Sequence, residues 1–87
     1  TQLLIDFGNC LFKMNEYDRA IKLYYETRML EPSNENVYQV LCVALAKLER
    51  YDEIFKLLNS ELNIVGNNNV LLHYYKDSKT RLGVNDD

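Results

Sequence analysis

Apolar side chains recur every three or four residues along most of the chain, which is the spacing that places them on one face of an α-helix. In the first such stretch the recurring positions are Leu4, Phe7, Leu11 and Met14. The stretches are separated by residues that commonly end helices, because they tolerate a left-handed backbone or cannot continue the hydrogen-bond ladder. The pattern therefore predicts five helices and no strand, with helices at about 3–14, 17–30, 36–48, 52–64 and 70–82 and breaks at Asn15, Pro32, Gly66 and Gly83.

The sequence also repeats internally. The dipeptide Tyr17-Asp18 returns later in the chain as Tyr51-Asp52. Other positions with the same separation agree as well: Leu11 with Leu45, Lys13 with Lys47, Lys22 with Lys56, Leu23 with Leu57 and Asn34 with Asn68. A period of this length, about 34 residues, in a helical chain predicts a helical hairpin stacked on a copy of itself.

The first copy resembles the tetratricopeptide repeat, a helix-turn-helix unit of about 34 residues. The positions that carry the resemblance are Leu4, Phe7, Gly8, Leu11, Tyr17, Ala20, Tyr24, Leu30 and Pro32. In that family the small residues at the places of Gly8 and Ala20 allow two helices to cross closely. The resemblance implies an all-α fold: a right-handed α-solenoid of two stacked antiparallel hairpins, followed by a C-terminal capping helix.

The later copies depart from the family pattern. The second keeps Tyr38, Leu41, Leu45, Tyr51, Leu58 and Ile64, but Cys42, Ile54 and Gly66 replace the usual glycine, alanine and proline. In the third segment Lys76 and Lys79 occupy places that are normally small or apolar. We therefore expect a first hairpin over residues 1–34, a degenerate second hairpin over 35–68, and at 69–87 a polar tail after a helix that is either a cap or half of a third repeat.

Charge and composition narrow the classes of partner. The formal net charge is −3, and the ten Lys and Arg residues form no stripe. Nucleic-acid binding requires many cations that neutralise phosphates, so we expect none by this segment. We likewise expect no membrane association, because no apolar stretch approaches the length of a bilayer crossing and the dispersed cations form no polybasic patch. Thr1 in place of Met suggests a part of a longer protein.

Chemistry-bearing residues are few. Cys10 and Cys42 form no C-x-x-C motif, and we expect both to be reduced and buried, which favours a cytoplasmic setting with the nucleus as the alternative. His73 and Asp77 share a helical face, but two ligands do not make a metal site. Because no catalytic constellation or phosphate loop is present, we expect neither an enzyme nor a cofactor.

Proteins of the tetratricopeptide family bind peptides or partner helices on a concave face that is lined by the first helix of each hairpin. The resemblance implies that Gln2, Ile5, Asn9, Phe12, Lys13, Asn36, Gln39, Val43, Ala46, Lys47, Val70, His73 and Asp77 line this face. Amide side chains can both donate to and accept from an extended peptide backbone. The expected function is a protein-protein interaction module, whose partner is another protein or peptide segment.

Two narrower hypotheses follow from the same resemblance. Some family members hold an acidic C-terminus with five polar residues, of which only Asn9 is in place here, since Ile5, Val40, Val70 and Tyr74 occupy the other positions. We expect no such carboxylate clamp. The alternative function is a self-associating regulatory segment of a larger protein such as a bacterial transcription activator, which the ending Leu82-Gly83-Val84 faintly resembles.

Overall fold

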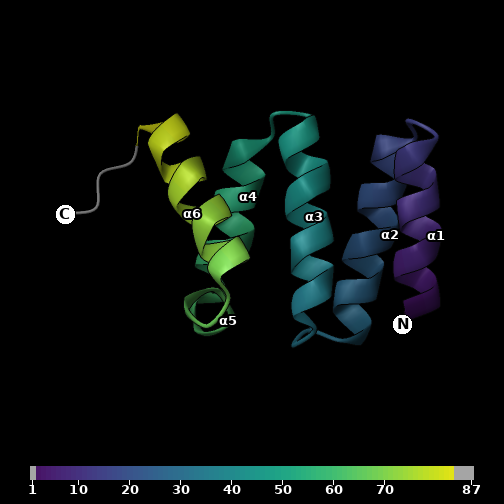
Figure 1. The fold of residues 1–87 in the computed structure, drawn as a ribbon, viewed down its shortest axis with the longest axis horizontal. Coiled ribbons are helices and arrows are strands. Elements are labelled where there is room, and N and C mark those ends of the chain that lie inside the picture. The colour runs from purple at the N-terminus through teal and green to yellow at the C-terminus, as the bar shows by residue number, and fades with distance from the viewer. Residues whose placement is uncertain (1, 84–87) are drawn as a thin grey trace.

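The computed structural model describes residues 2–83, and these residues form helices and connecting turns without any strand (Figure 1). The predicted all-α class is confirmed. The helices are α1 (Gln2–Lys13), α2 (Tyr17–Leu30), α3 (Glu35–Lys47), α4 (Tyr51–Asn59), α5 (Leu62–Gly66) and α6 (Asn69–Leu82). They follow one another along a molecule of about 40 × 24 × 18 Å.

Four of the five predicted helices agree with the structure to within two residues, but the fourth is wrong. The predicted helix over 52–64 is divided into α4 and the short α5. The Ser60 hydroxyl donates to the Leu57 carbonyl at 2.7 Å, and the Glu61 amide donates to the Leu58 carbonyl at 3.0 Å. The side-chain bond of Ser60 competes with the helical ladder, and the chain turns after Asn59.

The two hairpin turns are structural copies of each other. Asn15 and Glu49, which are one repeat period apart, both have left-handed backbones, with φ of 63° and 59°. The next residues, Glu16 and Arg50, both have φ −90° and ψ 62°. The amide of Glu16 donates to Leu11 at 2.8 Å, and that of Arg50 donates to Leu45 at 2.9 Å. The internal repeat of the sequence is therefore a repeat of backbone conformation at these turns.

Asparagine caps mark the starts of two helices at the same spacing. The Asn34 side chain accepts from the Asn36 amide at 3.0 Å, at the start of α3. The Asn68 side chain accepts from the amides of Val70 and Leu71, at 3.0 and 3.1 Å, at the start of α6. Gly83 ends α6 with φ 74°, as predicted. Val84, on which the activator-like ending depends, lies outside the described residues.

The close approach of α1 and α2 depends on two small residues. Gly8 and Ala20 are both buried, and a Cβ atom added at Gly8 would overlap the ring of Tyr24. The Tyr24 hydroxyl donates to Oδ1 of Asn9, which fixes the ring over the glycine. The expectation that these residues are small because the helices pack tightly is confirmed.

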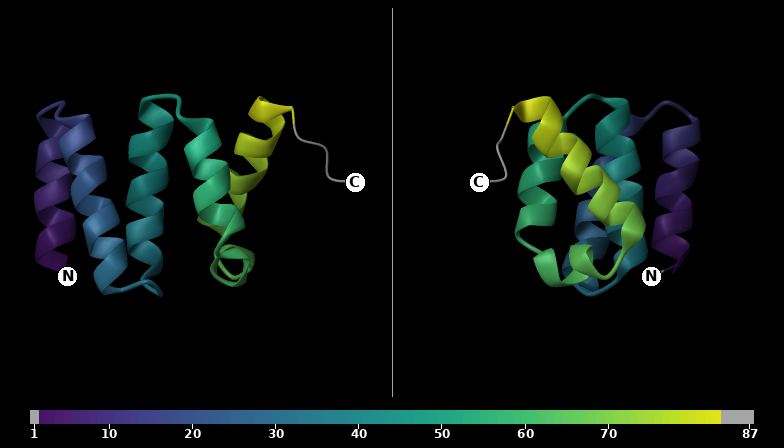
Figure 2. Two further views of the ribbon diagram at one scale, coloured as in Figure 1. Left: turned by 180° about the vertical axis from the view of Figure 1, so that it is seen from behind. Right: turned by 60° about the vertical axis from the view of Figure 1, so that its left-hand side comes forward.

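The core is centred on α3, which contacts α1, α2, α4 and α6. Six of its residues are buried: Val37, Tyr38, Leu41, Cys42, Ala44 and Leu45. The helices lie in a row, and α1 and α6 are at its opposite ends (Figure 2). None of the described helices combines the length and hydrophobicity needed to cross a bilayer.

The position of α1 at one end explains two departures from expectation. Cys42 is buried, but Cys10 is exposed, so the prediction that both cysteines are buried is wrong for Cys10. Phe7 and Met14, from the apolar stripe of the first helix, are 57% and 68% exposed. The reason is that α1 packs mainly against α2 and α3, so that its outer side lies at the end of the row of described helices.

Candidate partner-binding surface

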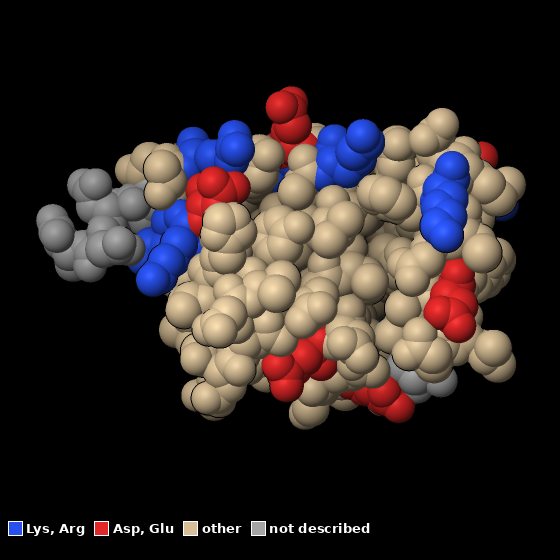
Figure 3. Space-filling model, in the orientation of Figure 1, with Lys and Arg blue, Asp and Glu red and all other residues tan. Residues whose placement is uncertain are grey.

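The three helices expected to line the binding face, α1, α3 and α6, lie on the same side of the molecule (Figure 1). The space-filling view of that side shows a broad uncharged centre, with Lys, Arg, Asp and Glu side chains gathered mostly along its edges (Figure 3). A surface of this composition offers little long-range attraction to nucleic acid or to a charged membrane. Its contacts must come from apolar groups and uncharged hydrogen-bonding groups.

On α1 the predicted residues divide between the surface and the interior. Gln2 is exposed and donates to Asp6 at 3.0 Å, and Lys13 is exposed. Phe12 is half-buried, with its ring 5.0 Å from that of Tyr17 in an edge-to-face arrangement. Ile5 is only 3% exposed, so it belongs to the core and has little surface to offer a partner.

Asn9 has a role that the sequence did not reveal. Its side-chain carbonyl oxygen accepts the hydroxyl proton of Tyr24, and the residue is half-buried. Because a buried tyrosine hydroxyl needs a hydrogen-bond partner, Asn9 supports the packing of α1 on α2. Only its NH2 group remains for a partner peptide.

The α3 helix presents the central strip of the surface. Val43 is 45% exposed although it is apolar, and Gln39 and Ala46 are half-buried beside it on the same helical face. Asn36 and Lys47, at the two ends of the helix, are exposed polar residues. The strip thus combines an apolar centre with polar ends.

On α6 the exposed predicted residues are Val70, at 48%, and His73. The imidazole ring of His73 lies 6.1 Å from the ring of Tyr74, again in an edge-to-face arrangement. Asp77 accepts from Arg81 at 2.9 Å, so its carboxylate is engaged in an ion pair. Within residues 2–83 no three His, Cys, Asp or Glu side chains come together as metal ligands.

The chemistry of this surface is that of neutral groups. Burial raises the pKa of the Cys42 thiol to about 12, which keeps it protonated and unreactive beneath the surface. Burial also raises the pKa of Tyr74, and the neighbouring Cys42 and Asp77 add to that shift.

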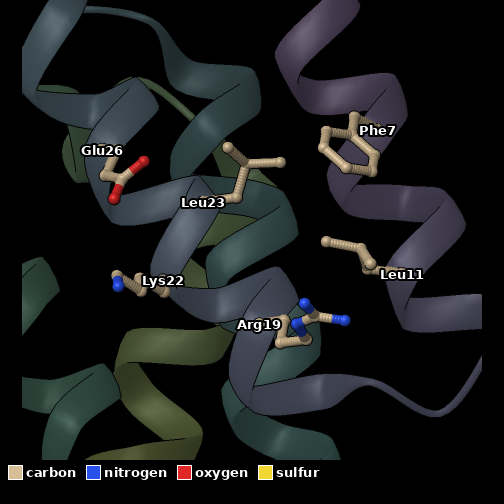
Figure 4. Close-up of a pocket in the computed structure, with 6 residues that line it drawn as sticks. All are labelled: Phe7, Leu11, Arg19, Lys22, Leu23 and Glu26. Atoms are coloured by element: carbon tan, nitrogen blue, oxygen red, sulfur yellow. The ribbon is translucent and has the colours of Figure 1, made fainter.

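Among the described residues, two of the grooves lie away from this surface. The larger, of about 380 Å³, runs between α1 and α2 and is lined by Phe7, Leu11, Arg19, Lys22, Leu23 and Glu26 (Figure 4). The second, of about 270 Å³, lies between α2 and α4 and is lined by Tyr25, Arg28, Glu53, Lys56, Leu57 and Ser60. None of these residues was predicted from the sequence to belong to a site, although an exposed aromatic residue, Phe7, lines the first groove.

Comparison with models of protein families, with curated proteins and with solved structures gives no match to this chain. Its function must therefore be argued from its own residues.

Proposed function

We propose that the chain is a tetratricopeptide-like protein-protein interaction module that binds an extended peptide or a partner helix on the surface formed by α1, α3 and α6. The observation that carries the proposal is the exposure of Val43 on α3 and Val70 on α6, two of the helices on the side whose centre is uncharged (Figure 3). Exposed apolar side chains that share one face with amides are typical of surfaces that recognise peptides.

The arrangement of the helices supports a solenoid of hairpins. Counting one repeat period from α1 leads to α3, and a second period leads to α6, and each of these helices contacts the next. The turns after α1 and α3 share their dihedral angles and hydrogen bonds, and Asn34 and Asn68 each cap the helix that follows. Stacked repeats of this kind produce one continuous face from equivalent helices, and that face is the proposed binding surface.

The surface favours a peptide of low charge. Its centre lacks the Arg and Lys side chains that would pair with carboxylates or phosphates, and its neutral groups cannot compensate a buried charge. Apolar side chains of the ligand would contact Val43 and Val70, while its backbone would bond to Gln39 and to the NH2 group of Asn9. We expect binding that depends only weakly on salt.

A selection from a displayed random-peptide library tests the proposal. Peptides selected on the wild-type chain are titrated against Val43→Asp and against Leu62→Asp. Both replace an exposed apolar residue by a carboxylate, but Leu62 is in α5 and is 52% exposed. Val43→Asp should weaken binding about tenfold or more, because it places an unpaired charge under the bound peptide. Leu62→Asp should bind as the wild type does.

Circular dichroism of both variants checks that they remain folded. Equal loss of binding in the two variants, or selected peptides that are indifferent to Val43→Asp, would contradict the proposal.

A further inference from the structure

The outer side of the first hairpin carries a second surface, separate from the proposed peptide-binding surface. On α1 the exposed residues Leu3, Phe7, Cys10 and Met14 are spaced by four, three and four residues. This alternation keeps side chains on one narrow stripe of a helix and is the spacing at which two helices pack along a seam. We define the end face as this stripe together with the neighbouring groove of Figure 4.

The spacing of the stripe is the same in both directions along the helix. If a second α1 lies antiparallel on the first, Leu3 comes opposite Met14 and Phe7 comes opposite Cys10, with the centre between Gly8 and Asn9. Leu3 is 82% exposed, so this pairing would bury side chains that are now almost fully in water. A symmetric register of this kind is what a two-fold contact between identical chains requires.

Two of the charged residues of α2 that line the groove have the same symmetry. Arg19 and Glu26 lie at opposite ends of the groove, with Leu23 between them (Figure 4). If a second α2 lies antiparallel on the first, Arg19 comes opposite Glu26 of the second copy, and Glu26 opposite its Arg19. The centre then lies between Lys22 and Leu23. At Arg19 and Glu26 the end face is thus complementary in charge to itself, while Lys22 comes opposite Leu23.

The two centres can lie on one symmetry axis. Gly8 packs against the ring of Tyr24, whose side chain tilts toward the start of α2, as helical side chains do. The centre of the α1 stripe is therefore level with the centre of the α2 charge pattern to within about one residue, or about 1.5 Å of helix rise. A single axis across the hairpin would place both helices on their own copies.

We propose that the end face binds a second copy of this chain in a two-fold, head-to-head dimer. The apolar stripe of α1 meets its own copy, and two Arg19–Glu26 ion pairs flank Leu23. This contact leaves the α1, α3 and α6 surface free in both chains, and it does not depend on the proposed peptide binding. An isologous contact of this type closes at two subunits, whereas a head-to-tail contact would continue into a filament.

Exchange of the charges at Arg19 and Glu26 provides the test. Sedimentation of the whole chain from about 1 μM to about 1 mM measures the association of each variant. The wild type should pass from monomer to dimer and stop there. Arg19→Glu places two carboxylates opposite two others, and Glu26→Arg places guanidinium groups together, so each variant should weaken the dimer about tenfold or more. The double variant restores opposite charges and should dimerise again, and an equimolar mixture of the two single variants should form a heterodimer.

Lys56→Glu is the matched control, because it makes the same change of charge at an exposed residue of α4, away from the end face. It should dimerise as the wild type does. Circular dichroism confirms that each variant is helical, which matters because Arg19 also lies 3.6 Å from Glu16 in its own chain. A monomeric wild type, assembly beyond the dimer, or a double variant that remains monomeric would each overturn the proposal.

Discussion

The smallest side chain of α1 lies beneath one of the largest of α2. Gly8→Ala would gain about 1 kcal/mol of helix propensity. However, the new methyl group would overlap the Tyr24 ring, which is 1% exposed and held by Asn9. Overpacking of a filled core costs about 1–3 kcal/mol, so Gly8→Ala should lower the free energy of unfolding in a urea titration.

Gly66 provides the matched control for this prediction. It ends α5, and no atom lies within 4 Å of the position of an added Cβ. Gly66→Ala should therefore leave stability unchanged or raise it by up to about 1 kcal/mol. If both substitutions shifted the free energy of unfolding in the same direction, the close packing of Gly8 on Tyr24 would not explain the effect of Gly8→Ala.

Glu49 is a second residue at which the local conformation decides the outcome. Its φ of 59° lies in the left-handed region, which costs a residue with a Cβ about 1–2 kcal/mol, and less for Asn. The equivalent residue of the first hairpin is Asn15. Glu49→Asn should stabilise the chain by about 0.5–1 kcal/mol, and Asn15→Glu should destabilise it by a similar amount. Thermal melts measure both variants. The account would be contradicted if Glu49→Asn and Asn15→Glu did not shift the melting temperature in opposite directions.

Among the elements, the start of α6 depends most on a single side chain. Asn68 caps two backbone amides and also donates from Nδ2 to Glu35 of α3 at 2.8 Å. Asn68→Ala loses the cap and this link between helices, so it should cost about 1–2 kcal/mol. Asn34→Ala loses a cap to one amide and a bond to Glu31 within the same loop, and should cost about 0.5–1 kcal/mol.

Chemical denaturation of the two variants makes the comparison. An Asn34→Ala variant at least as destabilised as Asn68→Ala would indicate that the contact with Glu35 adds nothing to the cap.

Helix ends could be predicted from the sequence where one residue determines the conformation of the nearby backbone. Asn15, Asn68 and Gly83 act on the backbone within a few residues, so the neighbouring helix ends agree with the structure. The break after Asn59 contains neither Gly nor Pro. It allows the short α5 to bring Val65, 1% exposed, into the core. That requirement comes from packing, which a local pattern does not contain.

The helices of the candidate surface remain a prediction, and the surroundings of some of its residues could not be predicted from the sequence. The choice of α1, α3 and α6 rests on the resemblance to the tetratricopeptide repeat. The burial of Ile5 and the bond from Tyr24 to Asn9 depend on contacts between helices. The exposure of Cys10 follows from the end position of α1, since the helical period does not reveal which apolar face has a neighbour.

For the whole molecule, the central position of α3 predicts a gradient of stability. This helix packs against four others, whereas α1 packs mainly against two and α5 is a single short turn of helix. Native-state hydrogen exchange should therefore be slowest in α3, where amides exchange only through global unfolding, and faster in α1 and α5, which can open locally. Mass spectrometry of peptic fragments measures these differences, and uniform protection would contradict the gradient.

The protein concentration should affect hydrogen exchange differently in α1 and α5, the two regions that open locally. If the end face pairs with a second copy, dimerisation stabilises the closed form of α1 and α2 by mass action, and their protection should rise as the chain is concentrated. The α5 helix lies outside the end face, and its exchange should stay constant. In Arg19→Glu the protection of α1 should lose its dependence on concentration. An equal rise in α1 and α5 would indicate association elsewhere on the molecule.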